Sequence, residues 1–246
     1  MMMQITIDKL IAMKLSGMVE GLEEQINSPV YNDLSFDERF SMLVDKEMTS
    51  RENRRLSMLM RRARFRHPNA CVEEIDFRAK RGIRKETVLK LAQNEWIKKH
   101  RNLIITGPTG VGKTYLACAF GISACRKGIS TCYVRLPRFL QEVKVARADG
   151  SYIKLLGKIS RIQVLIVDDW GLSPLNDTER RDFLEIVEDR HNVRSTIVST
   201  QYPVSKWHKI IDDPTIADAI CDRLVHNAYT LNLKGESMRK LQSDLT

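Results

Sequence analysis

The sequence predicts an α/β protein in which a parallel sheet, covered by helices on both faces, follows a small all-helical N-terminal domain. Two patterns predict this fold class. Residues 1–66 place apolar side chains at steps of three and four, the period of a helix, whereas short apolar runs alternate with helical stretches from residue 101 onward. We therefore expect a helical domain at 1–66, a linker at 67–100 and an α/β domain at 101–246.

The N-terminal domain is expected to contain two helical stretches. Apolar residues lie on one helical face of the first, and Pro29 ends that pattern; they are Ile7, Leu10, Ile11, Leu15, Met18, Leu22 and Ile26. The second stretch begins with a capping box, because the hydroxyl of Ser35 precedes Glu38 by three residues. This helix is expected to continue to about Arg66, since His67-Pro68-Asn69 disfavours further helix.

The α/β domain is expected to contain five strands separated by helices. The expected strands are 103–107, 131–136, 164–169, 195–200 and 229–233. The expected helical stretches follow the first strand to residue 128 and then cover 137–158, 176–193 and a polar region to about 226. The apolar run at 164–169 ends in two aspartates, as expected of a buried parallel strand.

Composition excludes several classes of protein. The hydrophobic content of 43% is sufficient for a sizeable core, which disfavours wholesale disorder. No apolar run approaches the 18 residues of a membrane span, and the N-terminus lacks a signal-peptide pattern. The five cysteines form no C-x-x-C pair, which disfavours a disulfide framework or a zinc site and favours a reducing cytoplasm.

The charge is distributed unevenly along the chain. The net charge of +9 favours a polyanionic partner, and residues 51–66 alone contain seven arginines and one glutamate. On the expected helix, one stripe consists of Arg51, Arg55, Arg62 and Arg66. This stripe is either a solvated helix face or a surface that neutralises DNA phosphates. A second basic cluster with the same two interpretations contains Lys144, Arg147, Lys154 and Lys158.

The segment between the first expected strand and the helix after it matches the phosphate-binding motif G-x-x-x-x-G-K-[ST]. Its residues are Gly107, Pro108, Thr109, Gly110, Val111, Gly112, Lys113 and Thr114. In such a loop, backbone N–H groups and the helix N-terminus cradle phosphates. Lys113 is expected to contact the terminal phosphates of ATP, and the Thr114 hydroxyl is expected to bind Mg²⁺.

Two aspartates at the end of the third expected strand are candidates for the chemistry of hydrolysis. Asp168 is expected to be a Mg²⁺ carboxylate, and Asp169 is placed to orient or deprotonate the attacking water. Without the phosphate-binding motif, the same pair would be interpreted as a cap for the next helix. Aspartate is one methylene shorter than glutamate, so slow, switch-like hydrolysis is expected.

Two further positions are candidate catalytic residues. A polar side chain at the end of the fourth expected strand, Thr200 or Gln201, can reach the γ-phosphate or the water, or it caps the strand. Arg223, in Asp-Arg-Leu, is either an arginine that stabilises transition-state charge on a neighbouring subunit or a surface arginine in a salt bridge.

Several motifs together resemble the AAA+ initiator clade, and more narrowly its IstB/DnaC group of transposition helpers and helicase loaders. They are GPTGVGKT (107–114), LIVDDW (165–170), STQYP (199–203), DRLVHNA (222–228) and GESMRK (235–240). The N-terminal segment at 35–65, followed by VEEIDF at 72–77, resembles the IstB-type ATP-binding proteins of insertion sequences over nearly the whole chain.

The resemblance implies an AAA+ P-loop NTPase with sheet order 5-1-4-3-2. It implies a bacterial cytoplasmic ATPase that forms a homo-oligomer on double-stranded DNA and delivers target DNA to a partner transposase, with no membrane involved. It assigns Asp168 and Asp169 to Walker B, Thr200 or Gln201 to sensor 1, and Arg223 to the trans-acting finger. Gln201 departs from the asparagine common in the clade. Arg239 resembles a sensor 2 position, but only seven residues follow it, so no separate lid domain is expected.

Two other functions use the same phosphate-binding motif. A replicative helicase loader of the DnaC or DnaI kind shares the chemistry and differs in its partner, although the N-terminal pattern favours the insertion-sequence proteins. A small-molecule P-loop kinase needs a lid and an acceptor pocket, and the Asp222-Arg223-Leu224 pattern disfavours it.

Overall fold

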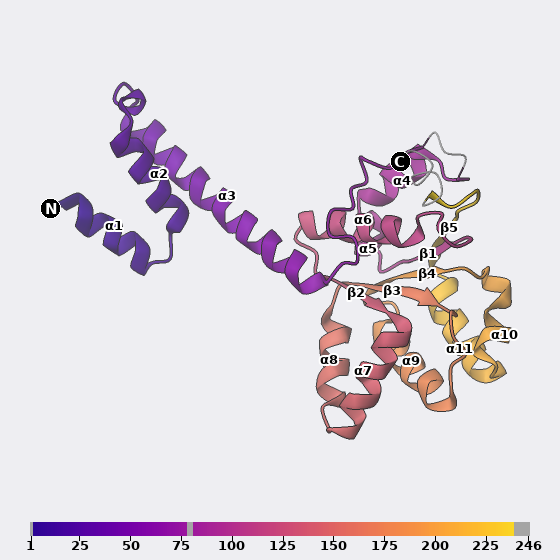
Figure 1. Ribbon diagram of the computed structural model, residues 1–246. Helices are drawn as coiled ribbons and strands as arrows, with labels where there is room; N and C mark the ends of the chain where they lie inside the picture. Colours follow the sequence, from indigo (N-terminus) through magenta and orange to yellow (C-terminus); the bar gives the residue numbers. More distant parts are fainter. Residues whose placement is uncertain (1, 78–80, 239–246) are drawn as a thin grey trace. The chain divides into compact units, whose positions relative to one another are not determined.

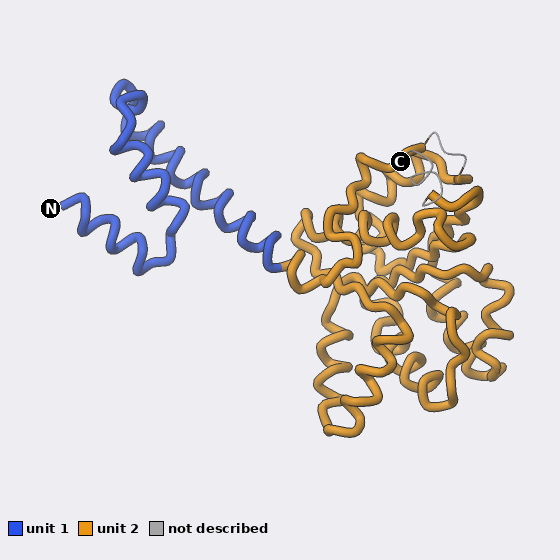
Figure 2. Tube along the Cα trace, in the orientation of Figure 1, with its two compact units in different colours: residues 1–58 blue, residues 59–246 orange. Residues whose placement is uncertain are grey.

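The structure is a computed structural model that describes residues 2–77 and 81–238. The chain divides into two compact units, residues 1–58 and residues 59–246 (Figure 2). The division therefore lies at residue 58 instead of the expected 66, and residues 67–100 belong to the second unit instead of forming a separate linker.

The first unit is helical, as its apolar period predicts. It contains α1 (Met2–Ala12), α2 (Ser16–Asn27), the short 3-10 helix η1 (Pro29–Tyr31) and most of α3 (Phe36–Ala63). The single apolar face expected from Ile7 to Ile26 is split between α1 and α2, because the chain turns at Lys14, whose φ is +61°. In consequence Ile7 and Leu10 are buried, whereas Ile11 and Ile26 are exposed.

The start of α3 is fixed by the capping box that the sequence predicts. The Ser35 backbone N–H donates to the Glu38 carboxylate at 2.8 Å, and the Glu38 N–H donates to the Ser35 hydroxyl at 3.3 Å. These two bonds satisfy N–H groups that have no partner within the first turn of a helix. The prediction of this helix start is confirmed.

The end of α3 differs from the expectation. The helix ends at Ala63, Arg64 has a φ of +54°, and Arg66 lies beyond the helix. The physical reason is packing: Ala63 and Phe65 are buried, and the Phe65 ring lies against Gly121 of helix α6 (Lys113–Arg126). The prediction that Arg66 lies on the same helix as the other three arginines of the stripe is therefore wrong.

The second unit contains one five-stranded parallel sheet. Its strands are β1 (Asn102–Thr106), β2 (Thr131–Arg135), β3 (Val164–Trp170), β4 (Ser195–Thr200) and β5 (Ala228–Asn232). The order is β2-β3-β4-β1-β5, and every neighbouring pair is parallel. This confirms the expected order 5-1-4-3-2, and the strand bounds match the apolar runs within about one residue.

Helices cover both faces of the sheet (Figure 1). Helices α4 (Lys85–Ala92), α5 (Glu95–Lys98) and α6 lie on one side. The other side carries α7 (Leu136–Ala148), α8 (Tyr152–Arg161), α9 (Asp177–Arg190), η2 (Val204–Lys206), α10 (Trp207–Ile211) and α11 (Pro214–Val225). The helix expected at 137–158 is two helices, because the chain turns at Gly150, whose φ is +78°.

The core explains why residues 67–100 are not a linker. Ala70, Val72, Val88 and Trp96 are buried in the second unit, so this segment completes the layer that contains α6. On the opposite face, Trp170 of β3 stacks on Phe183 of α9 with ring centroids 4.6 Å apart. Among the described helices, none is long and apolar enough to cross a bilayer.

Candidate nucleotide site

The phosphate-binding loop lies between β1 and α6, where the motif requires it. Gly112 is the N-cap of α6 with a φ of +95°, a conformation that glycine adopts without strain. Lys113 is buried, and its ammonium group donates to the Pro108 carbonyl at 2.8 Å. Burial lowers the pKa of Lys113, and the carboxylates of Asp168 and Asp169 act in the opposite direction. In a loop of this kind, backbone N–H groups and one buried cation together form an anion site.

A segment after β5 packs against this loop. The Leu233 N–H donates to the Thr106 carbonyl at 2.8 Å, and the Met238 N–H donates to the Gly110 carbonyl at 3.0 Å. A Cβ atom at Gly110, where φ is +85°, would collide with Ser237. Gly110 is therefore required both for its backbone conformation and for this close approach. Arg239, the sensor 2 candidate, lies outside the described residues.

A cavity of about 480 Å³ opens beside the loop. Its lining consists of the loop residues Gly110, Gly112, Lys113 and Thr114, together with His67, Glu74, Ile75, Asp76, Arg81, Tyr115 and Met238. Its volume lies within the range of small-molecule sites. The segment expected to be a linker thus supplies one wall of the site.

Arg81 places a second cation beside the phosphate-binding loop. Its side chain is 8% exposed, and one guanidinium nitrogen would lie 3.1 Å from a Cβ atom at Gly112. Another nitrogen donates to the Asp76 carbonyl, and the Arg81 carbonyl accepts from the Lys234 N–H at 2.8 Å. Its buried Nε has no hydrogen-bond partner within the described residues. A buried guanidinium with a free donor is suited to bind an anion.

Asp168 and Thr114 meet at the centre of the site. The Thr114 hydroxyl lies 2.9 Å and 3.2 Å from the two carboxylate oxygens of Asp168. The hydroxyl of Tyr133, on the neighbouring strand β2, donates to the same carboxylate at 2.8 Å. Burial and the Asp168 carboxylate raise the pKa of Tyr133, so this phenol stays protonated.

The Thr114 and Asp168 oxygens fit a magnesium ion. Mg²⁺ prefers hard oxygen ligands and is usually held by one or two protein groups together with substrate phosphates. A hydroxyl and a carboxylate in contact beside a phosphate-binding loop form that donor set. Within residues 2–77 and 81–238, no group of three or more His, Cys, Asp or Glu side chains is arranged to hold a metal by itself.

Asp169 lies at an irregularity in β3. The register of β3 against β4 shifts between Val167 and Trp170, and Asp169 has a φ of +60°. Its carboxylate accepts a hydrogen bond from Nε of Arg135, at the end of β2, at 2.5 Å. This ion pair raises the pKa of Arg135. The candidate base is therefore already paired with a cation.

The two candidates at the end of β4 have different surroundings. The Thr200 hydroxyl donates to the Trp170 carbonyl at 2.8 Å and accepts from the Tyr202 N–H at 3.1 Å. Thr200 is buried, whereas Gln201 is exposed just beyond the strand. The Thr200 hydroxyl thus caps the strand, which leaves Gln201 as the better candidate to reach a phosphate or water.

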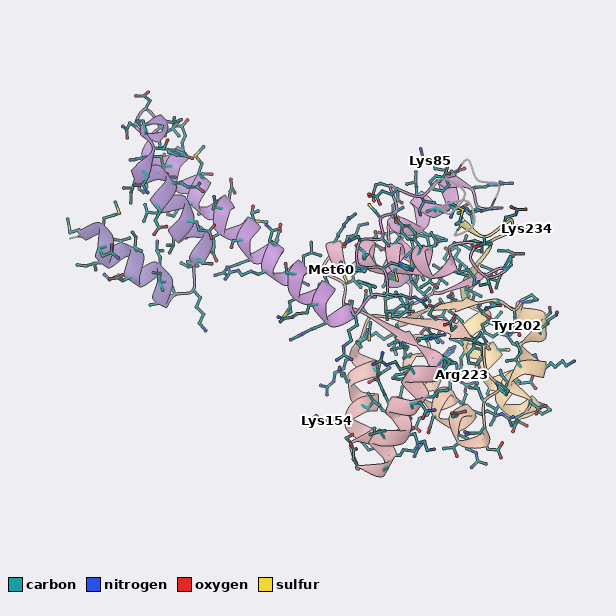
Figure 3. The ribbon with its side chains drawn as sticks, in the orientation of Figure 1. Met60, Lys85, Lys154, Tyr202, Arg223 and Lys234 are labelled. Atoms are coloured by element: carbon teal, nitrogen blue, oxygen red, sulfur yellow. The ribbon has the colours of Figure 1, made fainter. Side chains whose placement is uncertain are left out.

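Arg223 lies away from the phosphate-binding loop of its own chain. It is on α11, labelled in Figure 3, and its guanidinium pairs with Glu188 of α9. The Asn102 side chain, at the start of β1, donates to the Arg223 carbonyl at 3.0 Å. The loop follows the other end of β1, so Arg223 is not part of the cavity beside it.

The basic residues named from the sequence fall into three groups. Arg62, Arg66 and Lys158 line one cavity along β2. Arg51 and Arg147 are bound within the protein: Arg51 donates to Glu47 at 2.6 Å, and Arg147 donates to Asp182 at 2.8 Å and lies over the Tyr152 ring. Arg55, Lys144 and Lys154 are exposed outside that cavity, and Figure 3 labels Lys154 on α8.

Three residues of the site were not singled out from the sequence. Tyr133 and Arg135 could have been predicted from the sequence. They lie at the end of β2, which neighbours β3, and parallel strands end at the same edge of a sheet. Arg81 could not have been predicted in this way, since its segment has no regular period and reaches the loop only through the tertiary fold.

Comparison with known proteins identifies relatives over nearly the whole chain. The sequence pattern of the family described as IstB-like ATP binding protein matches residues 8–246. An insertion sequence ATP-binding protein, y4pL, of Sinorhizobium fredii is 47% identical over 96% of this chain and 96% of its own length. The ATP-binding protein of insertion sequence IS1162 from Pseudomonas fluorescens is 43% identical over 83% of this chain and 89% of its own.

A solved structure supports the fold. The crystal structure of the DnaC helicase loader matches with a TM-score of 0.57 and 24% identity over 68% of this chain and 97% of that one. Together with the sheet order, this shows the AAA+ P-loop NTPase fold that the sequence resemblance implies.

Proposed function

The chain belongs to the family of IstB-like ATP binding proteins, and from this premise we propose that it is an ATPase that forms a homo-oligomer on double-stranded DNA and assists a partner transposase. The family match supports ATP binding and an insertion-sequence context. The single observation on which the proposed chemistry depends is the contact of the Thr114 hydroxyl with the Asp168 carboxylate beside the phosphate-binding loop.

The nucleotide is proposed to bind with its phosphates on the loop at 107–114. Lys113 and Arg81 supply two cations, and the N-terminus of α6 supplies backbone N–H groups. Thr114 and Asp168 would hold Mg²⁺, which when bound neutralises charge on the phosphates. Tyr133 fixes the orientation of the Asp168 carboxylate through its hydrogen bond.

Hydrolysis is proposed to use Asp169 as the base. The water oxygen bonds to the γ-phosphorus, its proton passes to Asp169, and the bond from the γ-phosphorus to the oxygen of ADP breaks. Gln201 orients the water, and Arg223 from another copy stabilises the developing charge. The pairing of Asp169 with Arg135 supports slow, switch-like turnover, because an engaged carboxylate is a poor proton acceptor.

A replicative helicase loader is the second candidate function. The DnaC helicase loader shares this fold, and at 24% identity the likeness concerns the fold alone. The family match covers the N-terminal unit as well as the ATPase unit, and this favours the transposase-assisting function. In either case the protein is proposed to work in the bacterial cytoplasm.

The proposed hydrolysis is tested with two variants. We expect Asp169→Asn to bind ATP normally and to lose turnover by about 100-fold or more, the usual contribution of a general base. Arg223→Ala should also lose turnover, and mixing the two variants should restore part of it at mixed interfaces. If no mixing ratio restores activity, Arg223 has a structural role and does not act across subunits.

The proposed DNA and transposase partners need a separate measurement. Binding to a fluorescent 60-base-pair duplex should require ATP and weaken steeply with salt. The protein bound to this duplex should sediment as an oligomer. The proposed partner transposase should be retained by the DNA-bound oligomer and not by the protein with ADP. Retention of a replicative helicase in place of the transposase would favour the loader function.

A further inference from the structure

A basic groove runs along the free edge of the sheet in the second unit. Among the described strands, β2 is the outermost and pairs only with β3. The groove has a volume of about 880 Å³ and is lined by β2, by residues 59–66 and by helices α7 and α8. All of these residues belong to the second unit.

The lining of this groove has a strong excess of positive charge. Among the described residues it contains four arginines between residues 61 and 66, Arg135 on β2, Arg138 on α7, and Lys158 and Arg161 on α8, against the single acidic residue Glu142. All eight basic side chains are exposed. Apolar residues such as Phe139 and Ile159 form the floor. Like charges placed so close together repel, so the arrangement favours a bound polyanion.

The residue types favour phosphate groups over other anions. Seven of the eight are arginines, whose planar guanidinium groups bind phosphate oxygens with two parallel hydrogen bonds. They come from three separate segments of the chain, so one continuous polyanion can contact all of them. Among the described lining residues, the aromatic side chains are Tyr133 and the buried Phe139, and so few available rings disfavour recognition by successive base stacking. The sugar-phosphate backbone of duplex DNA is the occupant that fits best.

Two residues of the groove also touch the Walker B aspartates. Arg135 donates to the Asp169 carboxylate at 2.5 Å, and its side chain is 51% exposed. Tyr133, which also lines the groove, donates its hydroxyl to the Asp168 carboxylate at 2.8 Å. A phosphate in the groove would therefore compete with Asp169 for the Arg135 guanidinium.

We propose that this groove binds the phosphate backbone of duplex DNA and that a bound phosphate draws Arg135 away from Asp169, which frees the carboxylate for ATP hydrolysis. The inference rests on the proposed function for the identity of the polyanion. It adds the location of the contact and makes Arg135 a positioning residue that couples DNA binding to turnover.

The first test concerns the groove. The double variant Arg61→Glu with Arg138→Glu removes two of its cations, one from α3 and one from α7. We expect the affinity for a 30-base-pair duplex, measured by fluorescence anisotropy with ATP, to fall at least tenfold. The slope of log affinity against log salt should become shallower by about two, since each phosphate contact contributes about 0.9.

A matched control separates local from overall charge. Arg181→Glu with Lys209→Glu changes the net charge equally at exposed positions on α9 and α10, outside the groove. Thermal melting checks that each variant folds, and the control should bind DNA within twofold of wild type. Equal losses in the two variants, or wild-type binding by the groove variant, would overturn the groove as the DNA site. If the wild-type protein itself does not bind duplex, the proposed function is overturned together with the groove.

The second test concerns the coupling. Without DNA, Arg135→Gln should hydrolyse ATP several times faster than wild type, and DNA should stimulate it less than twofold. Arg135→Lys, which keeps the charge, should restore slow basal turnover and DNA stimulation. Basal turnover of Arg135→Gln at or below the wild-type rate, with DNA stimulation intact, would overturn the coupling and leave the groove tested separately. Stimulation of wild type by polyglutamate as strong as that by DNA would show that the groove binds acidic protein segments instead.

Discussion

The two units are stabilised by different kinds of contact. In residues 59–246, aromatic and aliphatic side chains on both faces of the sheet are buried, and Trp170, Phe183 and Trp207 are almost inaccessible. Among residues 2–58, all of which the structure describes, only Ile7 and Leu10 are buried apolar side chains. Large apolar side chains such as Phe36 and Phe40 are exposed there.

In the first unit, polar contacts partly compensate for the small number of buried apolar side chains. Gly17 of α2 approaches the backbone of α3 so closely that a Cβ atom would lie 2.6 Å from the Glu47 Cα. The buried Glu47 carboxylate accepts from the Gly17 and Met18 N–H groups, at 2.7 Å and 3.2 Å, at the N-terminus of α2. The comparison shows that an apolar core stabilises the second unit, whereas a few hydrogen bonds and a close helix contact stabilise the first unit.

The largest expected effect is the loss of ATP hydrolysis when the phosphate-binding loop of the second unit is changed. Lys113→Ala removes the buried cation of the phosphate-binding loop, so ATP hydrolysis should fall to background. Phosphate release measures turnover, and limited proteolysis should show residues 1–58 unchanged. Turnover equal to wild type would exclude this site.

A pair of core substitutions compares the stability of the two units. Phe183→Ala should lower the free energy of unfolding by about 3–5 kcal/mol because it removes a fully buried ring. Leu10→Ala should cost about 2 kcal/mol, confined to the first unit. All three tryptophans lie in the second unit, so tryptophan fluorescence in denaturant should report the first variant only, and proteolysis should report the second. A shift of the fluorescence transition by Leu10→Ala would contradict the separation of the units.

The third expected effect concerns the segment that the sequence predicted to be a linker. Arg81→Gln removes a buried cation beside Gly112. It should weaken ATP binding about tenfold, because one charge-assisted hydrogen bond contributes about 1.4 kcal/mol. Equilibrium binding of a fluorescent ATP analogue measures it, with Arg84→Gln, an exposed position nearby, as the control. Equal affinities of the two variants would show that Arg81 only supports the fold.

Two arginines of the expected stripe should now behave differently. Arg62 lines the groove of the second unit, whereas Arg51 is engaged by Glu47 in the first. Arg62→Gln should weaken duplex binding about fivefold, and Arg51→Gln less than twofold, as expected for exposed ion pairs. Titration of both variants at one salt concentration checks this, and the reverse order would favour the first unit as the DNA-binding surface.

The smallest effect appears only in acid. The Arg51 side chain, followed by the N–H groups of Met18 and Gly17, holds the pKa of Glu47 below its ordinary value of 4.5. A lowered pKa in the folded state means that the carboxylate stabilises the first unit above pH 4.5 and that this stabilisation is lost as pH falls below it. Proteolysis of residues 1–58 should therefore accelerate in wild type between pH 5 and 3, as measured with an acid-tolerant protease. Glu47→Gln should be cleaved faster at neutral pH and show a smaller acid-dependent change.

The sequence alone predicted the sheet, its strand bounds and the phosphate-binding loop. Each of these depends on a local pattern: apolar runs of one strand's length, and a motif whose glycines, lysine and hydroxyl act together within eight residues. The contact of Thr114 with Asp168 also follows, because β1 and β3 are parallel and end at the same edge of the sheet.

The tertiary structure decided what surrounds this centre. It ended α3 at Ala63 because Phe65 packs against α6, and that turn directs Arg66 to the groove beside β2. It brought Arg81 over the loop and paired Arg135 with Asp169. The contacts of Arg81 with Gly112 and of Arg135 with Asp169 join residues 31 and 34 positions apart, and no local period encodes such a distance. Local propensity and motif spacing determine the elements, whereas the choice of partner for each charged side chain depends on how the packed core places those elements.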